Sequence, residues 1–372
     1  MNIAWITVRR WDDLCSTTTD ALVKGLVRKG HLLTVFNADQ PDVHQKQPWS
    51  HVSLLQSNLP GRKGASLARS ALKWFQINHD SKFDVVMVDW PLASPLAKFL
   101  FARGERLVLM DRSPPADSSY LAKLQWRVWR KAWSLVKRNI ISEGLVVSDA
   151  HKTFVMNRCR IPSKKLHCIP AGVNLELFPH EEKVFDGVWN FVYHGRLDKN
   201  RGVLALPMLM RKLQEQGFNV RLSLVGKGDA VSSLKMIASN DPQISVQSRL
   251  SRPAMAQHLS KQHIGLLPMP NTKVWSMASP LKRSEYLAAG LFVYGIDHRG
   301  HRLEGINTDW FRLSAQEDFH DGAVAWMKEL SQLTHESYLE GVRSTRAYAE
   351  EFCAWDTSLH DLESVLISCI AD

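Results

Sequence analysis

The sequence predicts two consecutive α/β domains, each built around a doubly wound parallel sheet. Three observations support this fold class. Short apolar runs rich in β-branched residues recur along the chain, amphipathic helical segments separate them, and the alternation occurs twice, on either side of a proline- and acid-containing connection near residues 178–186. Runs that are apolar on both faces are typical of buried parallel strands, and strands alternating with helices indicate an α/β fold. The 372 residues are roughly the length of two ordinary domains.

The first domain begins with a strand at the N-terminus and continues through four further apolar runs. A helix over residues 19–29 follows the first strand, and Gly30 is suited to end that helix. Three runs end in an aspartate, Asp89, Asp111 and Asp149, at the carboxyl end of a strand, which is where doubly wound sheets bind ligands. The predicted strands are IAWITV (3–8), HLLTVFN (31–37), FDVVMVD (83–89), RLVLMD (106–111) and GLVVSD (144–149).

The second domain repeats the alternation with elements of similar size, and no sequence repeat relates it to the first. The predicted strands are WNFVYHG (189–195), VRLSLVG (220–226), ISVQ (244–247), HIGLLPM (263–269) and LFVYGID (291–297). The predicted helices cover residues 203–216, 230–239, 252–261 and 279–290, and the tail from about residue 337 forms two more.

Charge is distributed unevenly along the chain. Residues 1–170 carry 26 Lys and Arg against 13 Asp and Glu, whereas residues 171–372 carry 21 against 24. A half this basic favours an anionic partner, which can be nucleic acid, anionic lipid or a phosphorylated substrate. The five cysteines show no CxxC spacing, so we expect reduced thiols and no structural zinc. The N-terminus leads directly into a strand, which is unlike a secretory signal.

The helix over residues 279–290 carries cations in its first turns, although the dipole at a helix N-terminus normally disfavours positive charge. Ser279 can cap it, and Lys282 follows in the first turn. Two interpretations stay open at this point: the cations are solvated surface residues, or they bind an anion together with the free N–H groups of the helix.

A second cationic segment, YHGRLDKNRG, opens the second domain. Gly195 ends a strand and permits close backbone approach, and Arg196 and Arg201 flank the loop that follows. The planar fork of arginine suits a diphosphate, although a charged surface turn is the plainer interpretation. The glycine turn LVGKGD, which contains Gly226, is a weak signal by itself.

Together these segments resemble a known family. YHGRLDKNRG, SLVGKGD, IPAGVNLELF, SPLKRSEYLAAG and the late Trp-Asp pair look like glycosyltransferase family 4, retaining enzymes of the GT-B fold. The resemblance spans most of the chain. It implies two Rossmann-like domains facing across a cleft, an acceptor and membrane-facing domain over residues 1–180, a nucleotide-sugar domain over 181–345, and a C-terminal helix over 346–372 that packs back on the first domain.

The resemblance also implies roles for individual residues. Arg196 matches the arginine that grips the donor diphosphate, Arg201 stands where a lysine usually assists, and Glu285 matches the acid that binds the ribose. Lys282 would lie near the phosphates. The remaining donor-binding candidates are Gly195, Gly226, Leu281 and Thr18.

Two departures from the family pattern affect these assignments. The acid that often lies eight residues before the ribose-binding one is Met277 in this chain. The glycine pair after the first strand is also absent, and the loop from Trp11 to Asp20 takes its place, where the hydroxyl groups of residues 16–19 can serve instead.

The implied reaction is sugar transfer with retained configuration from a nucleotide-diphosphate sugar, UDP- or GDP-linked, with no required cofactor or metal. Arg196 and Arg201 would stabilise the leaving diphosphate. Asp89 and Asp111 are the candidates for the base.

The helix over residues 120–139 is strongly amphipathic. Cations lie on one face, and three tryptophans lie along its border with the apolar face. Indoles favour the headgroup zone of a bilayer, and cations favour anionic lipid, although packing on the sheet explains part of the pattern. The predicted membrane-binding residues are Lys123, Trp126, Arg127, Trp129, Arg130, Lys131 and Trp133.

We therefore predict a cytoplasmic, peripherally membrane-associated glycosyltransferase with a lipid-linked or surface-glycan acceptor. Nucleic acid is disfavoured as a partner because no stacking groove or recognition helix is evident. The alternatives are a non-catalytic GT-B homologue acting as a partner or regulator, a nucleotide-sugar epimerase, and a phosphorylase of the same fold.

Overall fold

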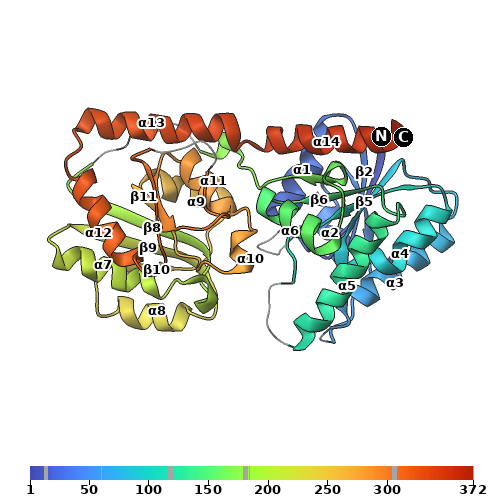
Figure 1. Cartoon of the computed structure of the whole chain (residues 1–372), viewed down its shortest axis with the longest axis horizontal. Helices are drawn as coiled ribbons and strands as arrows, with labels where there is room; N and C mark the ends of the chain where they lie inside the picture. The colour runs from blue at the N-terminus through green and yellow to red at the C-terminus, as the bar shows by residue number, and fades with distance from the viewer. Residues whose placement is uncertain are drawn as a thin grey trace. The chain divides into compact units, whose positions relative to one another are not determined.

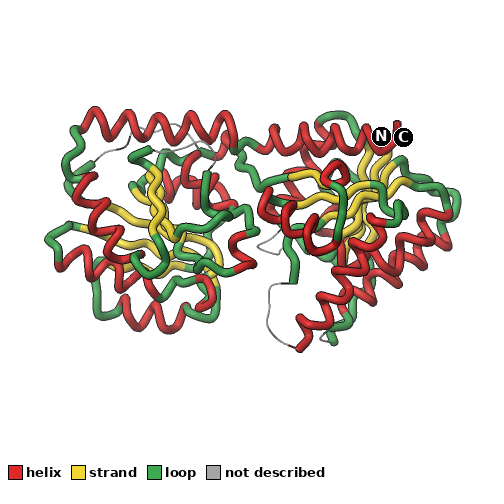
Figure 2. The backbone as a smooth tube through the Cα atoms, in the orientation of Figure 1, coloured by secondary structure: helices red, strands yellow, loops and turns green. Residues whose placement is uncertain are grey.

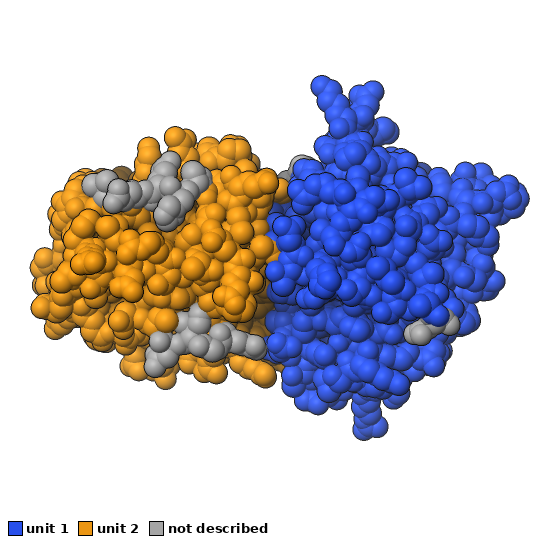
Figure 3. Space-filling view, turned by 90° about the horizontal axis from the view of Figure 1, so that it is seen from above, with its two compact units in different colours: residues 1–170, 355–372 blue, residues 171–354 orange. Residues whose placement is uncertain are grey.

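A computed structural model describes residues 1–11, 16–59, 61–115, 120–178, 183, 185–303 and 308–371. The chain divides into two compact units, which Figure 3 colours separately. Unit 1 comprises residues 1–170 and 355–372, and unit 2 comprises residues 171–354.

Unit 1 contains a parallel sheet that has seven strands in the described residues. Its order is β3-β2-β1-β4-β5-β6-β7, so the chain builds outward from β1 in one direction and then from β4 in the other (Figure 1). The strands are β1 (Asn2–Ile6), β2 (Leu32–Asn37), β3 (Ser50–Ser53), β4 (Val85–Asp89), β5 (Arg106–Met110), β6 (Glu143–Val146) and β7 (Leu166–Cys168).

Helices form two groups around this sheet (Figure 2). Neighbouring helices α3, α4 and α5 contact one another in sequence, and α1 packs against the C-terminal helix α14, which also contacts β4 and β5. The last helix of the chain is therefore part of unit 1. The helices are α1 (Thr17–Arg28), α2 (Pro41–His44), α3 (Lys63–Ile77), α4 (Trp90–Ala102), α5 (Tyr120–Lys137), α6 (Asp149–Cys159) and α14 (Trp355–Ala371).

Unit 2 contains a second parallel sheet, in the order β10-β9-β8-β11-β12-β13. The strands are β8 (Trp189–Arg196), β9 (Val220–Lys227), β10 (Ile244–Gln247), β11 (Ile264–Leu267), β12 (Phe292–Ile296) and β13 (Phe311–Ser314). The helices are α7 (Ala205–Glu215), α8 (Val231–Ala238), α9 (Arg252–Ser260), α10 (Lys273–Ser276), α11 (Leu281–Ala288), α12 (Phe319–Leu330) and α13 (His335–Phe352).

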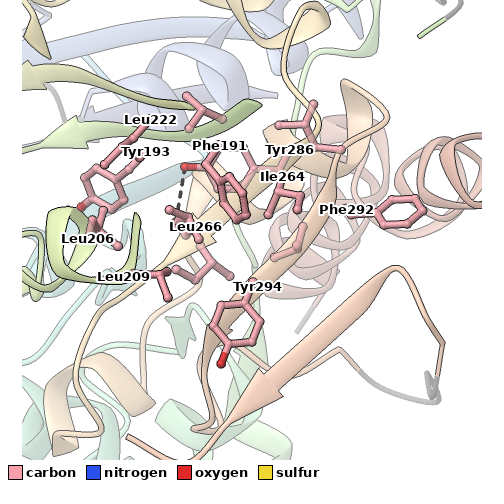
Figure 4. Packing of buried hydrophobic residues seen from close by; sticks show 14 of the residues in the cluster. Phe191, Tyr193, Leu206, Leu209, Leu222, Ile264, Leu266, Tyr286, Phe292 and Tyr294 are labelled. Carbon is pink, nitrogen blue, oxygen red and sulfur yellow. Dashed lines mark hydrogen bonds between the residues drawn. The ribbon is translucent and has the colours of Figure 1, made fainter. Parts of the chain in front are cut away.

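The core of unit 2 lies between the sheet and its helices. Figure 4 shows side chains of β8, β9, β11 and β12 packed with two leucines of α7. Phe191, Leu222 and Leu266 come from three adjacent strands, and Leu206 and Leu209 come from the helix. Continuous burial of these strands explains why their sequences are apolar on both faces.

The observed boundaries lie close to residues 170 and 354, whereas we expected 180 and 345. The backbone N–H of Val173 donates to the carbonyl oxygen of Cys353 at 2.7 Å, so the two connecting segments pair within unit 2. The expected boundary at residue 180 lies outside the described residues.

Candidate active site

The strand order of unit 2 reverses between β8 and β11, which are neighbours in the sheet although β9 and β10 separate them in sequence. In open parallel sheets, ligands bind outside the carboxyl ends of the strands at such a reversal. Gly195 and Arg196 end β8 and therefore lie at this point. The helix α11 follows β11 through α10 and brings a second set of side chains to the same place.

Two glycines shape the carboxyl end of β8. Gly195 has φ +111°, and a Cβ at this position would lie 3.9 Å from both Cε and Nζ of Lys282. The missing side chain therefore leaves the ammonium group close to the backbone. Gly226 pairs with Gly195 across β8 and β9, and a Cβ on Gly226 would lie 1.8 Å from the Gly195 carbonyl oxygen. Close strand packing thus accounts for Gly226.

The two predicted arginines converge on one carboxylate, Asp198. Arg196 donates from Nε to Oδ2 at 2.8 Å and from Nη2 to Oδ1 at 2.9 Å, while Arg201 Nε lies 3.6 Å from Oδ2. Partial burial opposes ionisation of Asp198, but the hydrogen bonds and charge of Arg196, together with Arg201, lower its pKa. The Arg201 guanidinium also lies 4.6 Å from the ring centroid of Trp275. The arginines therefore form one oriented cationic cluster.

The helix α11 adds a cation and a carboxylate. Lys282 is buried, and its Nζ lies 4.8 Å from the ring centroid of Tyr193. Glu285 Oε2 lies 3.2 Å from Nε2 of His194, and 24% of the Glu285 side chain is exposed. Burial alone would raise the pKa of Glu285, but the nearby His194, together with Lys282, lowers it. Leu281, the first residue of α11, is partly exposed.

The other cation of this turn has a structural role. Arg283 Nη1 donates to three successive carbonyl oxygens, those of residues 300–302, at 2.7–3.2 Å. The interpretation that the cations of this helix bind an anion therefore does not describe Arg283, which braces the loop after β12. Ser279 Oγ accepts from the Ala171 N–H at 3.0 Å, and Pro280 takes the N-cap position.

Unit 1 has the same kind of reversal, between β1 and β4, and Asp89 ends β4 there. Asp89 Oδ2 accepts from Thr7 Oγ1 at 2.7 Å and from the Val8 N–H at 3.0 Å. Burial raises the pKa of Asp89 against the opposing effects of these hydrogen bonds and of the Arg9 and Arg112 charges. Asp89 lines a cavity of about 620 Å³. A carboxyl group with a raised pKa beside a cavity has the properties of a general base.

Comparison with known proteins identifies a family domain in the first part of the chain. Residues 16–177, nearly all of them in unit 1, match the sequence model of glycosyltransferase family 4. The chain is a glycosyltransferase with a family 4 domain. No curated protein matches the chain in sequence.

Solved structures resemble this glycosyltransferase over its whole length, and they show the predicted GT-B fold. Sucrose-phosphate synthase from Thermosynechococcus elongatus superposes with a TM-score of 0.79 at 15% identity, covering 100% of this chain and 99% of that one. HepE from Anabaena, in complex with UDP-glucose, has a TM-score of 0.70 at 14% identity, with coverages of 99% and 100%. WaaG, a glycosyltransferase involved in lipopolysaccharide biosynthesis, has a TM-score of 0.67 at 11% identity, with coverages of 98% and 98%.

Asp111 of the glycosyltransferase does not match its predicted catalytic role. Its side chain is fully buried, and Oδ2 accepts from the indole N–H groups of Trp129 at 2.5 Å and Trp133 at 2.9 Å. His151 Nε2 lies 3.4 Å from the same oxygen. Asp111 therefore anchors α5 to the end of β5 and cannot reach a substrate.

The same contacts correct the membrane assignment of two tryptophans. Trp129 and Trp133 are fully buried, and Trp129 stacks on Phe154 of α6. Trp126 is half-buried and packs edge-on against Trp129. The helical border predicted to face a bilayer instead faces Asp111 and the core, because the indole N–H groups find their acceptor there.

The predicted cations of α5 are all exposed, namely Lys123, Arg127, Arg130 and Lys131. Two apolar residues expected on the buried face are exposed as well: Leu124 is 40% and Val128 is 38% accessible. The exposed surface of the N-terminal half of α5 is therefore both cationic and aliphatic. We call these six residues the α5 surface.

Thr18 belongs to unit 1, whereas the other donor-binding candidates belong to unit 2. Its hydroxyl group accepts from Arg112 Nη2 at 2.7 Å. Asp12 and Asp13 of the preceding loop lie outside the described residues.

Sequence reasoning missed two side chains that complete the unit 2 site. Asp198 orients both arginines, and His194 holds the ionised Glu285. Both stand inside YHGRLDKNRG, and the alternation of side chains along a strand places His194 and Arg196 on the same face. That periodicity was the available signal.

The described residues contain no group of three or more His, Cys, Asp or Glu side chains arranged to hold a metal ion. In that part of the chain, no helix combines the length and apolarity that crossing a bilayer requires.

Proposed function

We propose that this glycosyltransferase moves a sugar from a nucleotide-diphosphate sugar to a lipid-linked or cell-surface glycan acceptor, with retention of anomeric configuration. The observation that carries the proposal is the gathering of Arg196, Arg201, Lys282 and Glu285 at the β8/β11 reversal. HepE, which has the same fold, was solved with UDP-glucose, so UDP-sugars are the first donors to test and GDP-sugars the second.

Each group has a defined task in this proposal. The arginine pair and Lys282 hold the diphosphate, whose oxygens match the fork of a guanidinium. Glu285, kept ionised by His194, accepts hydrogen bonds from the ribose hydroxyl groups. Gly195 lets the diphosphate approach the backbone, because a side chain there would fill the space in front of Lys282.

The reaction forms a bond between the acceptor oxygen and the anomeric carbon as the bond from that carbon to the diphosphate oxygen breaks. The nucleoside diphosphate leaves with the bonding electron pair, and the cations neutralise its developing charge without requiring a metal ion. The acceptor hydroxyl proton passes to a base, for which Asp89 is the candidate because burial raises its pKa.

We further propose that the enzyme works in the cytoplasm at the inner face of the cell membrane, docked through the α5 surface. Four exposed cations favour anionic lipid, and the exposed Leu124 and Val128 add apolar contact. Changing all four cations to Gln should release the protein from vesicles that contain phosphatidylglycerol. Binding that persists in this variant would rule out membrane docking through the α5 surface.

Replacing Arg196 with Ala tests the catalytic proposal. The side chain is 46% exposed and pairs with Asp198, so the variant should fold normally. We expect transfer and slow donor hydrolysis from UDP-glucose to fall by about a hundredfold or more, since removing one donor to developing charge typically costs that much. An unchanged rate would remove Arg196 from the mechanism.

A further inference from the structure

Unit 1 contains a cavity that the proposed donor chemistry does not account for. It has a volume of about 620 Å³ and opens at the carboxyl ends of β1, β4 and β5, where the strand order reverses. The first turn of α3, the start of α4 and one face of α5 complete its wall. A reversal point with a formed cavity is where a doubly wound sheet binds its ligand.

The wall of this cavity is strongly cationic. Arg9 follows β1, Arg112 follows β5, Lys63 begins α3 and Lys131 belongs to α5. Among the described lining residues, Asp89 is the one carboxylate. Four cations from four separate segments around one acid give the cavity an excess of positive charge, which attracts an anionic ligand.

Two of these cations are held close to the candidate base. The charges of Arg9 and Arg112 both act on the Asp89 carboxyl group, and Arg112 is tethered through Nη2 to the Thr18 hydroxyl at 2.7 Å. Both hydrogen bonds that Asp89 accepts from described residues reach Oδ2. An anion bound by the arginines would therefore lie beside the carboxyl group.

The rim of the cavity is not purely polar. Val128 lines the cavity and is 38% exposed, and Leu124, one turn earlier on the same face of α5, is 40% exposed. A ligand with an anionic group inside the cavity can therefore continue over an aliphatic surface.

We propose that the acceptor carries a phosphate or diphosphate group next to the hydroxyl that receives the sugar, and that Arg9, Lys63, Arg112 and Lys131 bind this group. The inference rests on the proposed transferase function and names the class of its acceptor. The phosphate can belong to a soluble sugar phosphate or to a phosphate-linked lipid. The charge pattern fits both, and the apolar rim favours the lipid.

Titration of inorganic pyrophosphate into UDP-saturated protein tests the proposal, because UDP blocks the diphosphate site of unit 2. We expect the wild type to bind pyrophosphate under these conditions. The double variant Arg9→Gln/Lys63→Gln should bind it about tenfold or more weakly, as expected from losing contacts to a charged group. The matched control Arg69→Gln/Lys73→Gln removes two exposed cations from later turns of α3 and should bind as the wild type does.

UDP affinity, measured on every variant, separates the two ideas. A wild-type protein that binds neither UDP nor GDP would refute the proposed function. Normal UDP binding with no pyrophosphate site, or with equal affinity in the double variant, would refute the phosphate-bearing acceptor. Glucose 6-phosphate and a polyprenyl phosphate in detergent micelles, titrated in the same way, distinguish the sources. The ligand that binds more tightly identifies the source of the phosphate. If neither ligand binds, the proposal is refuted.

Discussion

Replacing Lys282 with Met gives the sharpest test of the donor site. Methionine keeps the length and apolar volume of the side chain, which is buried against Tyr193, while removing its charge. A hydrogen bond to a charged group contributes about 1.5–3 kcal/mol, and about 1.4 kcal/mol corresponds to a tenfold change in affinity. We therefore expect UDP to bind roughly 10- to 150-fold more weakly.

Calorimetric titrations with UDP and with uridine separate this charge effect from general damage. Uridine lacks the diphosphate, so the Lys282→Met variant should bind it as the wild type does. Lys235→Met removes a charge from the exposed face of α8 in the same unit and should leave both affinities unchanged. Unchanged UDP affinity in a normally folded Lys282→Met protein would refute the placement of the diphosphate beside α11.

Three further predictions concern acids and their partners. Asp89→Asn should abolish most transfer and the acid limb of the pH–rate profile. In the wild type, burial raises the pKa of Asp89, and activity falls when the carboxylate is protonated at pH values below that pKa. The acid limb should therefore lie above the ordinary aspartate pKa. A wild-type limb at the ordinary value would contradict the assignment. Trp133→Phe should lower the free energy of unfolding in urea by about 1–3 kcal/mol, because the buried Asp111 loses one N–H donor; an equal stability would contradict the anchoring role. Asp198→Asn should raise the KM for the donor about tenfold, because Arg196 loses its charged bidentate partner. The stability of the protein measured without UDP should stay constant. An unchanged KM would show that this pairing is dispensable.

Most of the fold could be predicted because parallel strands are buried on both faces. The runs ending at Asp89 and Gly195 are short and mostly apolar, and both form strands within one or two residues of the predicted ends. Three short edge or outer strands, β3, β7 and β13, were missed. Apart from the buried Leu166, their residues are partly buried or exposed, so their sequences lack a continuous apolar run.

The error in α5 has a different cause. A helical projection orders side chains around one axis but does not say which neighbours cover each face. The indoles of Trp129 and Trp133 lie at the border of the projection, and the buried carboxylate that receives their N–H groups is that of Asp111, which directly follows β5 and lies outside the helix. Conversely, Leu124 and Val128 lie on the projected apolar face but are exposed. Tertiary contacts, which periodicity cannot encode, decided all four positions.

The two candidate sites balance their charge in opposite ways, and this difference bears on how each selects its ligand. In unit 2, Asp198 pairs with the arginines and Glu285 lies near Lys282, so the cations are oriented before a ligand arrives and less ordering is required on binding. A diphosphate must then compete with an internal carboxylate, which disfavours weaker anions. In unit 1, four cations share the single acid among the described lining residues. That excess attracts any phosphate, so discrimination between acceptors must come from the shape of the cavity and its aliphatic rim.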